Sequence, residues 1–188
     1  MEKVMIKGEK IVISRMNDPS QQFVFELSYP RINKYLYDID PFTFMMDEKG
    51  KILEDEIIFY NNPFNDNDAV NYKEVYKSEK VYKSFEININ KMPKEVQAIS
   101  LVMSVYCKNR NKDNKPLFVE FDLEVINKTQ RSTLFSSVDN FDVMRYKTFV
   151  LGEIYKYRNS WKYNAVKQEM DDELMKVLRK MYQIKIFK

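Results

Sequence analysis

Residues 151–163 (LGEIYKYRNSWKY) predict two β-strands joined by a tight turn. Apolar and polar side chains alternate on both sides of Arg158-Asn159-Ser160, as they do in strands that bury one face. The stretch also holds the chain's only tryptophan and one of its three glycines. Residues 56–63 (EIIFYNNP) form a second strand-like stretch, which ends abruptly at two asparagines. Both stretches indicate a fold built from strands.

The same period of two recurs along most of the chain. It is clearest in residues 117–126, where every second residue from Leu117 to Val125 is apolar. The strand-like segments are, in chain order, residues 11–13, 23–25, 42–46, 57–60, 85–89, 99–106 and 118–126, followed by a hairpin over 148–166. Many short strands separated by polar turns predict a mainly β fold, an antiparallel β-sandwich.

Two segments depart from this period. Residues 92–96 predict a short connector, either a turn or a one-turn helix, because Pro93 is tolerated where a helix begins. Residues from about 171 to 183 predict a C-terminal helix. Its apolar face carries Leu174, Val177, Leu178 and Met181, and acidic residues open the helix while basic residues close it. We expect this helix to pack on the sandwich, and the alternative is that it binds a partner.

Composition limits the domain count and the chemistry. The 188 residues suit a single domain over 1–188, and a net charge of +3 is too small to indicate nucleic-acid binding. The chain has no histidine, which excludes histidine-based catalytic triads and zinc sites that need imidazole. The single cysteine, Cys107, follows an apolar strand and is expected to be buried, while residues 108–116 predict an exposed loop. No signal peptide or membrane span is visible, so we expect a cytoplasmic protein.

Several motifs, in this order, resemble the TerD family of tellurium-resistance proteins. They are residues 37–51 (YDIDPFTFMMDEKGK), 59–62 (FYNN), 89–96 (INKMPKEV), 151–155 (LGEIY) and 161–166 (WKYNAV), and the resemblance spans roughly residues 23–170. It implies a β-sandwich that is not an enzyme and that typically binds calcium. It also implies a role in bacterial stress and tellurite-resistance systems, where related domains associate with one another and with membrane partners.

Candidate metal ligands follow from the resemblance. Asp38 and Asp40 match the strand aspartates of the family, and they point to the same face because they are two residues apart. Asn61 and Asn62 match further family positions, although asparagines at a strand end also cap turns. The family's acidic, glycine-rich calcium loop corresponds here to residues 71–83, which have no glycine, no aspartate and four lysines. Because cations repel a divalent ion, we expect calcium binding to be weakened or lost, and no other cofactor is expected.

Residues 72–83 also suggest a candidate partner surface. Three tyrosines interleave with four lysines, a pattern that stacking on bases and attraction to phosphates both use. The residues are Tyr72, Lys73, Tyr76, Lys77, Lys80, Tyr82 and Lys83. Glu74 and Glu79 dilute the charge, so an ordinary exposed strand pair with lysines protecting its edge is favoured over nucleic-acid binding.

The sequence thus predicts a non-enzymatic, TerD-like binding or scaffold protein of the bacterial stress response. Its expected partners are related stress-resistance proteins, including a membrane-associated complex. One alternative is a calcium-binding stress protein that retains a site near Asp38 and Asp40. A second alternative is a basic, aromatic surface that binds nucleic acid or another anionic partner.

Overall fold

Two antiparallel sheets face each other in the computed structural model, which describes residues 3–15, 17–18, 21–31, 37–108, 110 and 115–182. Strands make up 61% of the structure, which confirms the predicted mainly β sandwich. The five-stranded sheet has the order β5 (Val70–Lys77), β6 (Lys80–Asn88), β2 (Gln22–Pro30), β8 (Phe118–Asn127) and β9 (Ser132–Asp142). The seven-stranded sheet has the order β1 (Lys10–Arg15), β11 (Ser160–Asn164), β10 (Thr148–Tyr157), β7 (Ala98–Cys107), β3 (Tyr37–Met46) and β4 (Ile52–Ile58), with β12 (Gln168–Met170) paired to β10.

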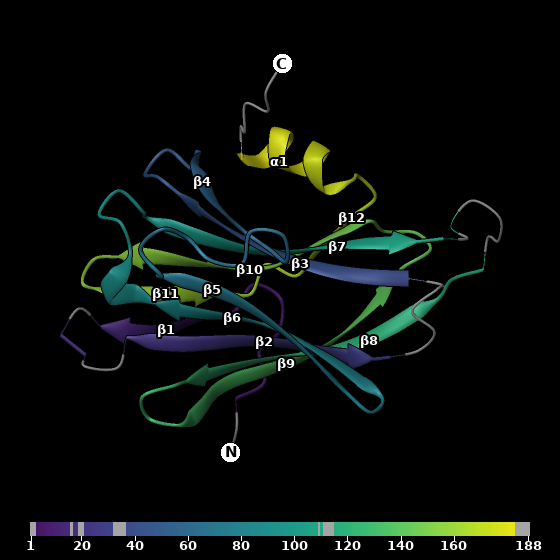
Figure 1. Cartoon of the computed structure of the whole chain (residues 1–188), viewed down its shortest axis with the longest axis horizontal. Coiled ribbons are helices and arrows are strands. Elements are labelled where there is room, and N and C mark those ends of the chain that lie inside the picture. Colours follow the sequence, from purple (N-terminus) through teal and green to yellow (C-terminus); the bar gives the residue numbers. More distant parts are fainter. Residues whose placement is uncertain are drawn as a thin grey trace.

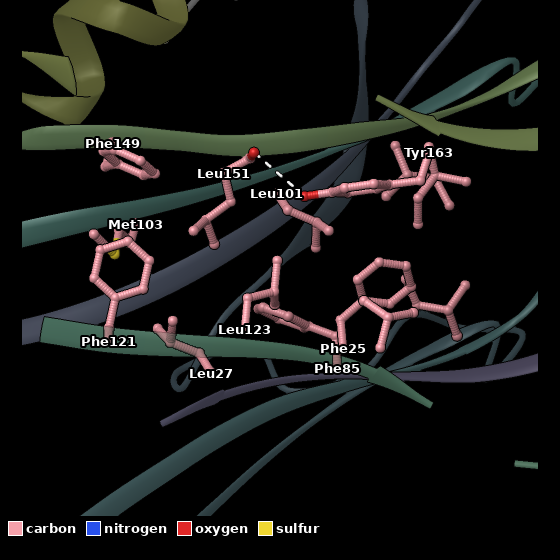
Figure 2. Close-up of a cluster of buried hydrophobic side chains, with 14 of the residues drawn as sticks. Phe25, Leu27, Phe85, Leu101, Met103, Phe121, Leu123, Phe149, Leu151 and Tyr163 are labelled. Atoms are coloured by element: carbon pink, nitrogen blue, oxygen red, sulfur yellow. Dashed lines mark hydrogen bonds between the residues drawn. The ribbon is translucent and has the colours of Figure 1, made fainter. Parts of the chain in front are cut away.

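The inward faces of the two sheets form the main core. Figure 2 shows aromatic and aliphatic side chains from both sheets meeting between them, among them Phe25, Phe121 and Leu123. In β8 the predicted alternation is confirmed, since Val119, Phe121, Leu123 and Val125 are all buried. Burial of alternate residues on facing strands is what fixes the register, because a slip by one residue would turn every apolar side chain to water.

Tyr163 lies at the centre of this core because Gly152 leaves it room. Its ring stacks on Phe135, with centroids 4.8 Å apart, and lies 5.8 Å from the ring of Phe25. Its hydroxyl donates to the carbonyl of Leu151 over 3.3 Å, the dashed line in Figure 2. A Cβ added at Gly152 would lie 2.3 Å from the Tyr163 hydroxyl and 2.6 Å from the carbonyl oxygen of Asn164. Only glycine therefore fits at this position.

Helix α1 (Leu174–Tyr182) lies on the side of the seven-stranded sheet that faces away from the second sheet, as Figure 1 shows. The predicted packing of the helix is confirmed, since it forms a second buried cluster with Phe44 and Val102 of the sheet. Tyr182, rather than the expected Met181, completes the buried face: its ring meets Phe44 edge-on at 4.8 Å and its hydroxyl lies 3.0 Å from that of Ser100.

The helix begins three residues later than expected because the chain just before it is held on strand β10. Residues 168–170 pair with β10 as strand β12, and the carbonyl of Asp172 accepts a hydrogen bond from Thr148 over 2.8 Å. Residue 183, the expected last helical residue, lies outside the described residues. The α-helix of the described ranges is too short to cross a membrane.

Three smaller outcomes concern connections. Within the expected connector of residues 92–96 the turn is confirmed, since the amide of Val96 donates to the carbonyl of Pro93 over 3.1 Å. The helical turn lies ahead of it, a 3₁₀ turn over Ile89–Lys91, because the side chain of Asn88 accepts the amide of Asn90 and caps the turn there. Cys107 is buried, as expected. Residues 109 and 111–114 of the expected exposed loop lie outside the described residues.

Substituting Gly152→Ala should destabilise the protein by about 3 kcal/mol, because the new methyl group meets a buried ring and a backbone carbonyl that have nowhere to move. Urea unfolding followed by circular dichroism measures the loss. Gly50→Ala is the matched control: nothing lies within 4 Å of an added Cβ there, so only its positive φ of 72° opposes alanine, at about 1 kcal/mol. Equal losses for the two variants would contradict the proposed steric role of Gly152.

Candidate functional site

Strand β3 carries the candidate site along an open edge. The register between β3 and β4 runs from Thr43 to Met46, so the first half of β3 lies at the edge of its sheet in the described part of the chain. A buried backbone carbonyl at such an edge has no neighbouring strand to donate a hydrogen bond to it. Another donor must take that place, because an unpaired buried carbonyl lowers the stability of the fold. For Ile39 two donors come from the opposite sheet: the Tyr29 hydroxyl at 3.2 Å and the Lys83 ammonium at 2.7 Å.

Lys83 is a buried cation between the two sheets. Its side chain is 3% exposed and points inward from β6. The Nζ atom lies 3.1 Å from Asp40 Oδ1, 3.7 Å from Glu74 Oε1 and 3.8 Å from Asp38 Oδ1. Asp38 and Asp40 come from β3, and Glu74 is the cross-strand neighbour of Lys83 on β5. One ammonium therefore holds three carboxylates that belong to both sheets.

Tyrosine hydroxyls fix Glu74 beside this ammonium. Tyr72 donates to Glu74 Oε2 over 3.0 Å, and Tyr76 donates to Oε1. The hydrogen bond to Glu74 is the main reason that the pKa of Tyr76 rises to about 12. Burial, and then the charge of Glu74, raises the pKa of Tyr72. Both phenols consequently stay protonated at neutral pH and act as donors to the carboxylate.

Burial raises the pKa of Asp40, and the adjacent Lys83 ammonium opposes that shift. Ionising the Asp40 carboxyl group costs free energy because the group is partly buried, and the positive charge of Lys83 offsets that cost. The cluster is therefore held together by one particular cation rather than by solvent.

These residues do not fit a calcium ion. Calcium needs 6–8 oxygen ligands around a common centre. Here the ammonium of Lys83 already lies between the Ile39 carbonyl and Asp40, and its charge repels a second cation. No group of three or more acidic, cysteine or histidine side chains is placed to hold a metal ion within the described ranges.

The four residues expected as metal ligands lie in two different places. Asp38 and Asp40 both approach Lys83. Asn62 instead holds a turn: its side-chain amide donates to the carbonyl of Ile57 over 2.7 Å, and its backbone exchanges two hydrogen bonds with Phe59. Asn61 is exposed. Asn62 thus closes the turn that follows β4, which is the turn-capping role that the sequence left open.

The seven residues of the expected partner surface lie on both faces of the five-stranded sheet. Tyr72 and Lys83 are buried and face inward. Lys73, Lys77, Lys80 and Tyr76 are exposed and Tyr82 is half-buried. The exposed lysines have partners: Lys73 binds Glu86 at 2.6 Å, Lys80 binds Asp122 at 3.1 Å, and the Lys77 ammonium lies 5.0 Å from the centre of the Tyr82 ring.

An open groove of about 590 Å³ lies beside Lys73, and sequence reasoning missed it. The loop that follows β4 forms one wall with Pro63, Phe64 and Asp68. The ends of β5, β6 and β2, together with Lys91 and Lys128, form the opposite wall. Glu86 lies between Lys73 at 2.6 Å and Lys128 at 2.8 Å on this wall. Phe64 is 58% exposed. The sequence signal for the groove is this aromatic residue among the asparagines and aspartates of residues 61–68.

Asn65 fixes the wall of the groove. It is buried, and its side-chain oxygen accepts the amides of Ala69 at 2.9 Å and Val70 at 3.0 Å. Its side-chain nitrogen donates to Glu56 over 2.8 Å. The loop therefore presents Phe64 from a rigid base.

Substituting Glu74→Gln should lower the pKa of Tyr76 from about 12 towards 10.0, because the charged acceptor that favours the neutral phenol is lost. A pH titration of the assigned Tyr76 ring carbon by NMR measures the change. Glu79→Gln is the matched control. It also removes one carboxylate, but not the one that accepts the Tyr76 hydrogen bond, so the pKa of Tyr76 should stay near 12. A Tyr76 titration that stays near 12 in Glu74→Gln would disprove the assigned hydrogen bond.

Comparisons with known proteins agree with this architecture. A crystal structure of SAV2460, a protein of unknown function, superposes with a TM-score of 0.59 at 9% sequence identity and covers 85% of this chain and 95% of its own. A homologue of the telluride resistance protein TerD from Streptomyces coelicolor A3(2) has a TM-score of 0.58 at 9% identity, over 86% of this chain and 96% of that one. At this identity the two structures show the shared fold alone. The family model described as the TerD domain matches residues 1–182, and the chain therefore belongs to the TerD family.

Proposed function

We propose that this protein is a non-enzymatic binding or scaffold module of the bacterial stress and tellurite-resistance response, and that calcium binding in it is weakened or lost. We place it in the cytoplasm, in complexes with related stress-resistance proteins, including a complex at the membrane. The observation that carries the proposal is the Lys83 ammonium, which lies among the carboxylates where a calcium ion would otherwise be expected. The family is not a known family of enzymes, which supports a binding role.

The groove beside Phe64 is the surface that suits a protein partner best. It combines one exposed aromatic ring with Lys73, Lys128 and Glu86, so it offers an apolar anchor surrounded by charges of both signs. Interfaces typically centre on such an aromatic residue inside a polar rim. The rigid base at Asn65 keeps the ordering cost of docking small.

Nucleic acid is a poorer partner for this sheet. Besides the paired lysines, its outer face carries Glu26, Glu120, Asp122 and Glu124. Glu26 and Glu124 are direct cross-strand neighbours, and burial together with the charge of Glu124 raises the pKa of Glu26. A phosphate backbone would meet these carboxylates and be repelled by them.

The wild-type protein should unfold at the same temperature in millimolar calcium and in a chelator. A useful calcium site would stabilise it by about 2.7 kcal/mol when calcium is about 100-fold above the dissociation constant. Differential scanning calorimetry in the two buffers, at equal ionic strength, measures the difference. A calcium-dependent rise in the unfolding temperature would support the alternative of a calcium-binding stress protein.

Substituting Phe64→Ala should abolish tellurite tolerance in a bacterial strain that depends on this protein and weaken binding to purified TerD-family partners about tenfold or more, equal to about 1.4 kcal/mol. Phe64 is exposed, so the fold should change by less than about 0.5 kcal/mol. Tolerance on tellurite plates and calorimetric titration measure the two effects.

Phe118→Ala is the matched control, since Phe118 is 63% exposed. It lies at the opposite end of β8 from Lys128 of the groove, about 30 Å away at about 3.3 Å per residue. If both variants bind partners as the wild type does, or if both lose tolerance equally, the groove is not the binding surface.

A further inference from the structure

We propose that the outer face of the five-stranded sheet binds a second copy of this chain, face to face, about a two-fold axis that runs along the central strand β2. The face is open, since the described residues place no helix over it, whereas α1 covers the outer face of the other sheet (Figure 1). The occupant follows from the order of the side chains on the face. The inference uses neither the groove nor any partner of the proposed function.

Opposite charges lie on opposite halves of this face. The outward side chains of β5 and β6 include three exposed lysines, and those of β2 and β8 include four carboxylates. Glu86 of β6 is already paired with two lysines, at 2.6 and 2.8 Å. The face is therefore basic towards its edge at β5 and acidic towards its edge at β9. The lysines are Lys73, Lys77 and Lys80, and the carboxylates are Glu26, Glu120, Asp122 and Glu124.

One row of cross-strand neighbours has the same kind of residue at both ends. Its members, in the order β5, β6, β2, β8 and β9, are Val75, Tyr82, Ser28, Asp122 and Val138. Val75 is 46% exposed and Val138 is 54% exposed. A two-fold rotation about an axis along β2 exchanges the two ends of the row. Val75 then faces Val138 of the second copy, and the Tyr82 hydroxyl faces the Asp122 carboxylate, so the row complements itself.

The neighbouring row pairs charges under the same rotation. Lys80 lies two residues before Tyr82 on β6, and Glu120 lies two residues before Asp122 on β8. Strands β6 and β8 run parallel because each is antiparallel to β2, so Lys80 and Glu120 lie at the same height. The rotation places Lys80 over Glu120 of the second copy, twice in each dimer. An axis across the strands would instead place β5 over β5 and lysine over lysine, so the charges select one orientation.

The area of the face and one carboxylate set the expected affinity. Five strands of eight residues or more cover about 600 Å² on each copy, at about 4.8 Å between strands and 3.3 Å per residue. A total of about 1,200 Å² is at the lower end of specific interfaces. Glu26 lies on β2, so the axis brings it near its own copy, although burial and then Glu124 already raise its pKa. We therefore expect a weak dimer, with a dissociation constant of about 10⁻⁵ M.

Lys80→Glu and Glu120→Lys test the charge pairing between copies. Each variant alone places like charges together twice in every dimer, so its dissociation constant should rise about tenfold or more. In an equal mixture, both contacts again join a lysine to a glutamate, so a mixed dimer should form about as tightly as the wild type. Sedimentation velocity, with a fluorescent label on one variant, measures the dissociation constants and identifies the mixed dimer.

Lys49→Glu is the matched control for net charge. Lys49 is exposed in the turn between β3 and β4 of the other sheet, so this variant should associate as the wild type does. An equal loss in Lys49→Glu and Lys80→Glu would overturn the proposal. A wild type that stays monomeric at ten times the expected dissociation constant, or a mixture that associates no more than its components, would also overturn it.

Val75→Cys and Val138→Cys test the orientation without changing any charge. Within one molecule the two positions lie four strand spacings apart, about 19 Å, whereas the proposed dimer places each opposite the other. A short bis-maleimide should link Val75→Cys to Val138→Cys in a mixture and should link neither variant to itself. The native Cys107 is buried and does not compete. Links within a single variant would show a different arrangement, and an absence of links in the mixture would show no face-to-face dimer, so either result would refute the proposal.

Discussion

The close approach of Tyr163 to the backbone at Gly152 is the constraint on which the core depends. The ring lies where a side chain of residue 152 would be, and it packs against Phe135 and Phe25 of the other sheet. Strand β11, which carries the ring, is paired on one side to β10 and on the other to β1. The irregularity between Val150 and Gly152 in the pairing of β10 with β7 lies at the same point. The absence of a Cβ at residue 152 thus lets a ring of β11 lie against β10 and still reach the opposite sheet.

Much of the fold could be predicted because alternation is a local signal. Residues 117–126 show it without interruption, and they form β8 as expected. Strand β9 was not anticipated, because Ser136, Ser137 and Asp139 interrupt its apolar pattern although Phe135 and Phe141 are fully buried. The end of α1 was predicted to bury Met181, yet Tyr182 is buried because Phe44 and Ser100 provide partners for its ring and its hydroxyl. Such partners lie far away in the sequence and leave no local pattern.

The candidate site was predictable only in part for the same reason. The spacing of Asp38 and Asp40 placed both carboxylates on one face, and both do approach one cation. That the cation is Lys83 could not be read from the sequence, since Lys83 is one of four lysines in residues 71–83 and its contacts span 43 and 44 residues. Its burial separates it from the exposed pairs of the outer face, such as Lys80 with Asp122. Exposed pairs of this kind contribute about 0–1 kcal/mol, whereas removal of one member of a buried pair costs about 3–5 kcal/mol.

The position of α1 gives the molecule two unlike sides. The helix covers the outer face of the seven-stranded sheet, while the described residues place no helix over the five-stranded sheet (Figure 1). A row of molecules stacked sheet upon sheet needs two free faces on each member, because its contacts run head to tail. Because α1 lies on the outer face of the seven-stranded sheet, the described residues leave the outer face of the five-stranded sheet as the one that a flat neighbour could meet without displacing a helix.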